Sequence, residues 1–411
     1  MSLTARFSEA IEALTGPEAS GPFGVAVSGG GDSVALLALA AEWATARGVV
    51  LHAVTVDHGL RPEAAGEAAE VGRQAAALGL SHETLKWDGW DGRGNLQAAA
   101  RAARYRLLAD WAARRGVTSV LLGHTQDDNV ESFVMGLMRG AGLDGLSGMR
   151  PRFSRGEVAF LRPLLGQSRT GLRAYLRRGG LGWIEDPSNE DERFDRVRIR
   201  KALLAAGVDQ AKIAESILNL RRTRAGIDAV LARWAEAHVR EDRGELVIAP
   251  EAFAALPGEL ARRLLNAALR WVSGADYPPR ADPVMRLVDG AWPARGRTLH
   301  GCVLRAERRG LVIGREPSAA AAAPRAATDA VWDGRWVLEG PHGPGLEIRA
   351  LGPEGLKLCP GWREAGGSRA ALLVSPAVWR GPRLVAAPLA GHGEGWRARI
   401  ARSFAASFTL H

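Results

Sequence analysis

The sequence lacks clustered cysteines and long apolar runs. Its two cysteines, Cys302 and Cys359, lie far apart, with no CxxC pair and no cysteine/histidine cluster. A zinc site or an iron–sulfur cluster is therefore disfavoured, and both thiols are expected to be small buried hydrophobic side chains. No apolar stretch approaches the ~20 residues that a membrane span needs. The N-terminal residues 1–16 predict an amphipathic helix rather than a secretory signal. We therefore expect a cytoplasmic protein with no membrane partner.

The chain has more basic than acidic residues, 54 against 45. The chain of 411 residues has a formal net charge of +9, which suits a polyanionic partner such as nucleic acid. An arginine-rich coding sequence gives the same balance by drift, so charge alone leaves both explanations open. The length is sufficient for two or three domains with cores of their own.

Short β-rich runs alternate with helical stretches in the first part of the chain. This alternation predicts crossover connections and a twisted parallel sheet flanked by helices, an α/β, Rossmann-like fold. The expected strands cover residues 23–27, 49–56, 82–87 and 118–122, and the expected helices cover residues 33–46, 62–78, 96–115 and a segment that runs through residue 139.

The pattern changes after about residue 205. We expect residues 1–205 to form the α/β domain and residues 206–316 to form a mainly helical domain rich in arginine. Residues 317–330 read PSAAAAAPRAATDA, a composition typical of a linker. Residues 331–411 are rich in glycine and proline and predict a small C-terminal domain with short strands.

A glycine-rich loop, Ser28-Gly29-Gly30-Gly31-Asp32-Ser33, follows the first expected strand and precedes a helix. Glycines let backbone N–H groups approach a ligand closely, and a helix N-terminus favours an anion. The two serine hydroxyls can donate to phosphate oxygens, and Asp32 suits a divalent metal shared with phosphates. The alternative is a plain turn in which Asp32 or Ser33 caps the helix. No Lys-Ser/Thr pair follows, so the Walker A class is disfavoured.

Polar motifs stand near the carboxyl ends of the other expected strands, where open α/β sheets bind ligands. After the fourth strand, Asp127 and Asp128 lie four and three residues before Glu131, so each pair shares a helix face. Such carboxylates near ATP hold Mg²⁺ or attract a cationic substrate, with helix capping as the alternative for Asp127. The motifs are Asp57-His58-Gly59-Leu60-Arg61, Asn95 to Tyr105, Gly123-His124-Thr125 to Ser132, Arg162-Pro163-Leu164-Leu165, Glu185-Asp186-Pro187-Ser188-Asn189 and Ile199-Arg200.

Together these segments resemble the tRNA(Ile)-lysidine synthetase family of the PP-loop ATP pyrophosphatases, whose loop reads SGGxDS. The resemblance implies an ATP-dependent ligase that forms a carbon–nitrogen bond. Such an enzyme activates C2 of the wobble cytidine in the CAU anticodon of tRNA(Ile) by adenylating its carbonyl oxygen. The ε-amine of L-lysine then displaces AMP to give lysidine. Among the positions that depart from the family pattern are Thr125, Asn129, Ser132 and Val197.

The resemblance also implies roles for individual residues. ATP would lie on Ser28, Gly29, Gly30, Gly31, Asp32 and Ser33, with its adenine near Asp57 and His58. Asp32 would help to hold Mg²⁺, and Asp128 and Glu131 would bind lysine. Arg104, with Arg101, would support the phosphate or the adenylated intermediate; a solvated helix face is the alternative for both arginines. The general base stays open between His124 and Glu131. The domains after residue 205 would select the tRNA, and the oligomeric state stays open, a homodimer included.

Three other functions fit the sequence less well. A tRNA thiolase of the same superfamily needs catalytic cysteines or an iron–sulfur cluster, and residues 1–301 contain no cysteine. A glutaminase-linked enzyme needs a glutaminase with a nucleophilic cysteine of its own, and the sequence shows no sign of one. A catalytically dead ATP- or RNA-binding module is disfavoured because the loop and the carboxylates Asp128 and Glu131 are intact.

Overall fold

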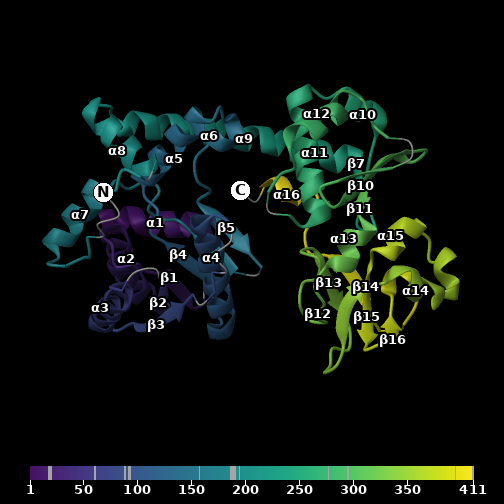
Figure 1. Ribbon diagram of the computed structural model, residues 1–411, viewed down its shortest axis with the longest axis horizontal. Coiled ribbons are helices and arrows are strands. Elements are labelled where there is room, and N and C mark those ends of the chain that lie inside the picture. The colour runs from purple at the N-terminus through teal and green to yellow at the C-terminus, as the bar shows by residue number, and fades with distance from the viewer. Residues whose placement is uncertain are drawn as a thin grey trace. The chain divides into compact units, whose positions relative to one another are not determined.

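The computed structural model describes residues 1–16, 21–59, 62–87, 89–90, 94–156, 158–185, 191–193, 195–275, 277–293, 296–393 and 395–409. It forms two compact units, Met1–Arg224 and Ala225–Leu410 (Figure 1). The division falls within the long helix α9 (Gln210–His238).

The first unit is built on a six-stranded sheet with strand order β3-β2-β1-β4-β6-β5. Neighbouring strands pair in parallel from β3 through to β6, and only β5, at the edge, is antiparallel to its neighbour. The predicted parallel α/β sheet is thus confirmed. The strands are β1 (Phe23–Ala26), β2 (Leu51–Asp57), β3 (Ser81–Lys86), β4 (Ser119–Leu122), β5 (Arg152–Arg155) and β6 (Val158–Leu161).

Hydrophobic cores cover both faces of this sheet because successive strand residues point in opposite directions. Val25 and Ala53 pack with α1, α2, α3 and α7, whereas Ala26 and Val54 pack with α4. The helices of this unit are α1 (Leu3–Thr15), α2 (Gly31–Arg47), α3 (Ala64–Ala77), α4 (Leu96–Arg115), α5 (Gln126–Met138), α6 (Leu143–Leu146), α7 (Arg169–Arg178) and α8 (Asp195–Ala205).

Helix α4 has the bounds that its sequence predicts, because both of its ends carry local signals. The Asn95 side chain accepts a hydrogen bond from the backbone N–H of Ala98 at 3.1 Å and caps the first turn. Gly116 ends the helix in the left-handed conformation, at φ +65°.

The second unit contains a five-stranded antiparallel sheet packed against helices. Its strand order is β7-β8-β11-β10-β9. Helices α9 and α11 contribute a large share of the core on this sheet, which includes the buried Cys302. The elements, besides α9, are β7 (Val239–Asp242), β8 (Glu245–Ile248), α10 (Pro250–Ala254), α11 (Gly258–Ser273), α12 (Ala281–Val288), β9 (Arg297–Leu299), β10 (Cys302–Glu307) and β11 (Gly310–Arg315).

The alanine-rich segment 317–330 differs from the expected linker. It forms helix α13 (Pro317–Ala322) and strand β12 (Ala326–Ala327), and β12 pairs with β14. Ala320 is only 1% exposed. Small side chains allow this segment to approach its neighbours closely, so a composition that predicts a flexible connection here serves close packing instead.

The last part of the chain adds a four-stranded sheet, β12-β14-β15-β16, and a two-stranded one, β13-β17. The chain then returns to the preceding core, where Phe404 and Phe408 pack with residues of α9, α11 and β8. The second cysteine, Cys359, is also buried, as the sequence predicts. The elements are β13 (Trp336–Glu339), β14 (Glu347–Ala350), α14 (Gly352–Lys357), the 3-10 helix η2 (Pro360–Arg363), α15 (Arg369–Leu373), β15 (Pro376–Arg380), β16 (Arg383–Ala386), the 3-10 helix η3 (Pro388–Ala390), β17 (Arg397–Ile400) and α16 (Ala406–Thr409).

Candidate active site

The glycine-rich loop connects β1 to α2 and is closed by its two serines. The Ser33 hydroxyl accepts the backbone N–H of Ser28 at 3.0 Å and donates to the carbonyl oxygen of Gly30 at 2.9 Å. The two hydroxyl oxygens of Ser28 and Ser33 lie 3.2 Å apart. Ser33 is buried and holds the turn, whereas Ser28 is exposed and can meet a ligand.

Glycine is required at the second position of this loop. Gly29 has φ +86°, and a Cβ there would lie 2.7 Å from Cδ1 of Ile184. Helix α2 then begins after Gly30, which has no side chain to cap it. The positive end of a 17-residue helix is therefore left to an anion.

Four carboxylates gather beside this loop. Asp32 comes from the first turn of α2, and Asp127, Asp128 and Glu131 come from the first two turns of α5. All four are within reach of one residue, Arg169, at the start of α7. The shared helix face predicted for the α5 carboxylates is confirmed, and Asp32 joins them from a segment far away in the sequence.

The guanidinium of Arg169 uses three nitrogens on three different carboxylates. Nε donates to Oδ2 of Asp32 at 3.0 Å, Nη1 donates to Oε1 of Glu131 at 2.7 Å, and Nη2 donates to Oδ1 of Asp128. Burial opposes its charge, but the carboxylates of Asp128, Glu131 and Asp32 together raise its pKa above the ordinary value. Arg169 therefore stays a cation at the centre of the cluster.

The carboxylates respond differently to this neighbourhood. Burial raises the pKa of Asp32 despite the opposing pull of Arg169. For Asp128 burial acts in the same direction, but Arg169 and the backbone N–H of Thr125 outweigh it and lower the pKa. The two groups are thus tuned apart by one shared cation.

One oxygen of Glu131 remains available. Glu131 is only 2% exposed, and its Oε1 accepts from both Arg169 and Arg200, the latter at 2.8 Å. Its Oε2 is buried and has no hydrogen-bond partner among the described residues. A buried carboxylate oxygen without a donor is costly, which marks a place for a donor from a ligand.

The start of α5 is capped by Thr125 rather than by Asp127. The Thr125 hydroxyl accepts the backbone N–H of Asp128, while Oδ2 of Asp128 accepts the backbone N–H of Thr125 at 2.8 Å, forming a capping box. Asp127 instead accepts the backbone N–H of Arg169 at 2.8 Å. The threonine that departs from the family pattern thus has a structural task.

Asn129 and Val197, two further departures, are buried, at 5% each. Oδ1 of Asn129 accepts the backbone N–H of Met149 at 2.7 Å. Both residues are therefore accommodated within the packing of the first unit.

A second group of side chains beside the carboxylates is cationic. Arg104, on α4, is partly buried, and no ion pair includes it within the part of the chain that the structure describes. Burial lowers its pKa, with Arg101 adding to the effect. Arg162, which follows β6, is 7% exposed, and its guanidinium carbon lies 4.4 Å from the ring centre of Phe153. Cations at least partly buried and without an ion-pair partner among the described residues suit an anionic ligand.

His124 stands between the cationic and the anionic groups. The Nε of Arg162 donates to Nδ1 of His124 at 3.2 Å, which requires Nδ1 to be unprotonated. Burial and Arg162 lower the pKa of His124 to about 3, although Asp128 opposes them. His124 is therefore a neutral imidazole that presents Nε2–H as a donor.

Asp57 is the last residue of β2, and His58 follows it in a turn. Oδ1 of Asp57 accepts the backbone N–H of Gly59 at 2.8 Å. Burial, followed by the nearby Arg104, lowers the pKa of His58, and its Nδ1 is buried without a partner among the described residues. The ring stands edge-on to Trp87 with centres 5.8 Å apart.

The structure thus brings Asp32, Asp128 and Glu131 together. Arg104 instead lies close enough to His58 and His124 for its charge to lower the pKa of both imidazoles. Sequence reasoning missed Arg169 altogether and gave no role to Arg162 or Arg200. The motif around Arg162 and the Ile199-Arg200 pair were signals for two of them; Arg169 is 137 residues from Asp32 and carries no local signal. Leu60, Arg61 and the stretch Asp186-Pro187-Ser188-Asn189 lie outside the described residues.

The donor set is compatible with Mg²⁺ shared with phosphates. In the described ranges no group of three or more histidine, cysteine or acidic residues is arranged as a metal cage. Mg²⁺ bound with a nucleotide usually needs only one or two carboxylates plus phosphate oxygens. Oδ2 of Asp32 is engaged by Arg169, which leaves Oδ1 for this purpose.

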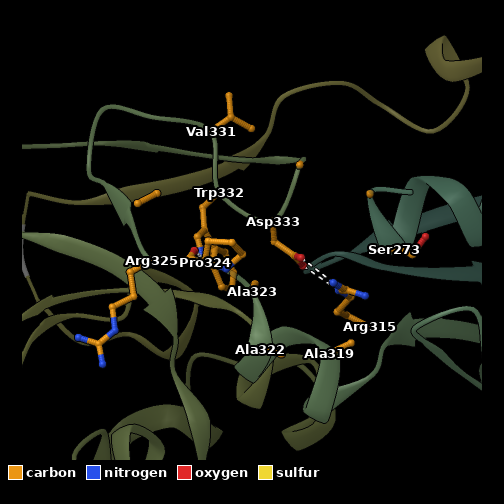
Figure 2. A pocket seen from close by; sticks show the side chains of 13 residues that line it. Ser273, Arg315, Ala319, Ala322, Ala323, Pro324, Arg325, Val331, Trp332 and Asp333 are labelled. Carbon is orange, nitrogen blue, oxygen red and sulfur yellow. Dashed lines mark hydrogen bonds and ion pairs between the residues drawn. The ribbon is translucent and has the colours of Figure 1, made fainter. Parts of the chain in front are cut away.

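A pocket of about 500 Å³ lies wholly within the second unit, between the end of α11, α13 and the segment 331–334 (Figure 2). Its charged lining is satisfied, because Arg315 forms two hydrogen bonds with Asp333, at 2.7 and 2.8 Å. Trp332 donates through Nε1 to the carbonyl oxygen of Pro324. The pocket includes none of the predicted site residues, and alanines form much of its wall.

None of the helices in the described ranges is long and apolar enough to span a membrane.

The chain is similar to several known proteins. A family model described as a PP-loop domain matches residues 3–206. The tRNA(Ile)-lysidine synthase of Ruegeria pomeroyi is 49% identical over 380 residues, which cover 92% of this chain and 90% of the relative. That of Hyphomonas neptunium is 42% identical over 313 residues, which cover 74% and 84%. Among solved structures, a U34-tRNA thiolase from Methanococcus maripaludis aligns with a TM-score of 0.45 at 14% identity, over 53% of this chain and 78% of that one.

The loop after β1, the carboxylates on α5 and the extent of these sequence matches lead to one assignment. Identity close to one half over nine-tenths of both chains leaves no large part of this protein unmatched. The chain belongs to the tRNA(Ile)-lysidine synthase family, in which its first unit carries the ATP-binding PP-loop domain.

Proposed function

We propose that this protein joins L-lysine to C2 of the wobble cytidine in the CAU anticodon of tRNA(Ile), with ATP converted to AMP and pyrophosphate. The C2 carbonyl oxygen attacks the α-phosphorus and pyrophosphate leaves. The ε-amine of lysine then attacks C2, and AMP leaves with the former carbonyl oxygen. The observation that carries this proposal is the carboxylate cluster beside the loop, with a buried, unpartnered oxygen on Glu131.

ATP binds on residues Ser28, Gly29, Gly30, Gly31, Asp32 and Ser33, where the uncapped end of α2 faces its phosphates. Asp57 and His58, at the end of the neighbouring strand β2, border the adenine. Asp32 helps to hold Mg²⁺, which neutralises charge on the leaving pyrophosphate. Arg104 supports the phosphate or the adenylated base, and its lack of an ion-pair partner among the described residues supports this role.

Lysine binds through Asp128 and Glu131. Among the described residues, two cations, Arg169 and Arg200, contact the four carboxylates directly, so the carboxylates outnumber the cations that touch them and attract a cationic substrate. Oε2 of Glu131 is the oxygen free to accept an ammonium N–H. A lysine amine held there lies against a carboxylate that neighbouring arginines keep in place.

The ammonium of lysine must lose a proton before it attacks C2. Of the two candidates for the general base, Glu131 fits better than His124. The lone pair on Nδ1 of His124 accepts from Arg162, and an imidazole with a pKa of about 3 is a weak base at neutral pH. His124 instead donates Nε2–H, to a phosphate or to the oxygen that gains charge at C2.

The tRNA is bound by arginines after residue 205. Not all arginines of this region are free for it, since Arg263 is 6% exposed and pairs with Glu259, while Arg221 donates to the carbonyl oxygens of Ser147 and Met149. Exposed arginines that suit phosphate contacts include Arg222, Arg233, Arg280, Arg286, Arg380 and Arg383.

The expected division into residues 1–205, 206–316 and 331–411 remains our proposal for the functional parts, with the tRNA contacts in the last two. A cytoplasmic location follows from the substrate.

The test is incubation of the purified protein with ATP, Mg²⁺, radiolabelled lysine and a CAU-anticodon tRNA(Ile) transcript. Stable label in the tRNA is expected, and it should disappear when the wobble cytidine is replaced by uridine. Pyrophosphate release without label would contradict lysine as the nucleophile. Asp32→Ala should abolish label while tRNA affinity stays nearly unchanged, and equal loss of both would show that the loop is structural.

A further inference from the structure

Among the described residues, Arg169 is the one side chain that contacts both groups of carboxylates assigned above. Its Nε contacts Asp32, the residue assigned to the metal, and its two terminal nitrogens contact Asp128 and Glu131, the residues assigned to lysine. These carboxylates come from α2 and α5, whereas Arg169 comes from α7. Three separate helices therefore meet at a single guanidinium.

The backbone of Arg169 is fixed on both sides. Its N–H donates to Oδ2 of Asp127 at 2.8 Å, and the carbonyl oxygen of Gln167 accepts the backbone N–H of Gln126 at 3.0 Å. Leu172 and Leu176, one and two turns further along α7, are fully buried in the core that α2 shares. A side chain on so anchored a backbone is suited to hold its partners in place.

We propose that Arg169 is a positioning residue for both steps of the reaction, which ties the carboxylate that serves the metal to the carboxylates that bind lysine. This inference rests on the proposed function. Arg169 takes one oxygen from each of three carboxylates and leaves Oδ1 of Asp32 and Oε2 of Glu131 for ligands. Its charge reduces repulsion within the cluster, and its planar geometry sets the spacing between the two sites.

A lysine side chain at position 169 could not take over the role of Arg169. A guanidinium presents N–H donors in a rigid planar arrangement, whereas an ammonium is a compact point charge on a flexible stem. Arg169→Lys therefore keeps the charge and loses the three-way geometry. Arg169→Ala loses both and leaves a space of guanidinium shape.

The first measurement is lysine affinity by calorimetry on the full-length protein, for the wild type, Arg169→Ala, Arg169→Lys and the control Arg173→Ala. Arg173 lies on the same helix, is 45% exposed at its side chain and pairs only loosely with Glu185, at 3.8 Å. Both Arg169 variants should weaken lysine binding about 30-fold or more. The control should stay within about threefold.

The second measurement is tRNA-dependent pyrophosphate release without lysine, which reports on the first step alone. It should fall in both Arg169 variants, because Asp32 loses its partner as well. Millimolar guanidinium should restore lysine binding and pyrophosphate release to Arg169→Ala in part, whereas urea, planar but uncharged, should not. A merely structural defect would not respond to guanidinium.

Five results would overturn the inference. Tighter lysine binding by Arg169→Ala would show that Arg169 competes with the substrate. Wild-type affinity in Arg169→Lys would show that charge alone suffices. Loss of lysine binding with unchanged pyrophosphate release would contradict the link to Asp32. Wild-type protein that incorporates lysine while Arg169→Ala retains full affinity would refute this inference alone, and wild-type protein that incorporates none would refute the proposed function with it. Thermal unfolding of each variant shows whether it is folded, and Arg169→Lys keeps the test valid if Arg169→Ala is not.

Discussion

Each unit of the protein contains a buried glutamate held by two arginines. The two sites differ in whether both oxygens of the carboxylate have hydrogen-bond partners. Glu131 in the first unit and Glu245 in the second are both 2% exposed. Arg169 and Arg200 share a single oxygen of Glu131, whose other oxygen has no partner among the described residues. Both oxygens of Glu245 are used, Oε1 by Arg305 and Oε2 by Arg309 and Ser368.

The charge balance separates the two sites further. Around Glu131, four carboxylates face two arginines. Around Glu245, the carboxylates of Glu245, Asp242 and Glu307 are paired with four arginines. A saturated cluster without negative excess holds strands together, whereas an unsaturated and negative one is prepared for a cation. Burial therefore does not distinguish a binding glutamate from a structural one, because both are equally buried. The oxygen of Glu131 that has no partner among the described residues does.

The largest expected effect comes from Glu131→Gln. The amide keeps the size of the side chain and removes the charge that would meet the lysine ammonium and accept its proton. We expect kcat/KM for lysine to fall about 1,000-fold or more, measured as label incorporated into tRNA. Thermal stability should change little, because two cations and three carboxylates remain. Near-normal incorporation would place the lysine site elsewhere.

Glu245→Gln should show the opposite pattern. It removes the most buried counter-charge of Arg305 and Arg309, which keep only the more exposed Asp242 and Glu307, so the free energy of unfolding should fall by about 3 kcal/mol. Lysine incorporation per folded molecule should be unchanged. The measurement is urea unfolding, with the exposed Glu251→Gln as the control. Loss of activity without loss of stability would break the comparison between the two glutamates.

His124 should make the first unit sensitive to acid. Its pKa is 6.5 when exposed and about 3 in the folded protein, so between these values only the unfolded chain binds the proton. The stability that depends on a neutral His124 is complete above pH 6.5 and decreases as the pH falls toward 3. His124→Asn keeps an acceptor for Arg162 but does not titrate. The stability difference between the two proteins should therefore change by about 2 kcal/mol from pH 7 to pH 5, in the direction that disfavours the wild type at low pH.

That difference is read from urea unfolding of both proteins in parallel, in which other titrating groups cancel. A difference that stays constant with pH would show that His124 does not remain neutral in the folded protein.

The smallest expected effect is at the rim of the Glu245 cluster. Arg240 is 59% exposed at its side chain and lies 3.2 Å from Asp242. Arg240→Ala should lower the free energy of unfolding by no more than about 0.5 kcal/mol, because solvent screens the pair. A loss as large as that of Glu245→Gln would mean that the cluster acts as a unit out to its rim.

The sequence was informative where a signal is local. The loop of residues 28–33, the bounds of α4 and the shared face of Asp128 and Glu131 each depend on neighbours within a few residues. Arg169 was missed because its importance depends on Asp32, 137 positions away. Segment 317–330 was misjudged because alanine suits both a mobile connection and a tightly packed one, and only the surrounding core decides between them. The partners of His124 likewise come from tertiary structure, since Arg162 lies 38 residues away.

The return of the chain to the core around α11 has a consequence for biosynthesis. The first unit is complete once residue 224 has been translated, so it can fold while the ribosome still makes the rest. The second unit has to wait, because Phe404 and Phe408 are part of the same core as Leu231 and Leu246. Until those phenylalanines emerge, the apolar faces of α9 and α11 lack part of their cover, so the nascent second unit exposes apolar surface until its synthesis is nearly complete.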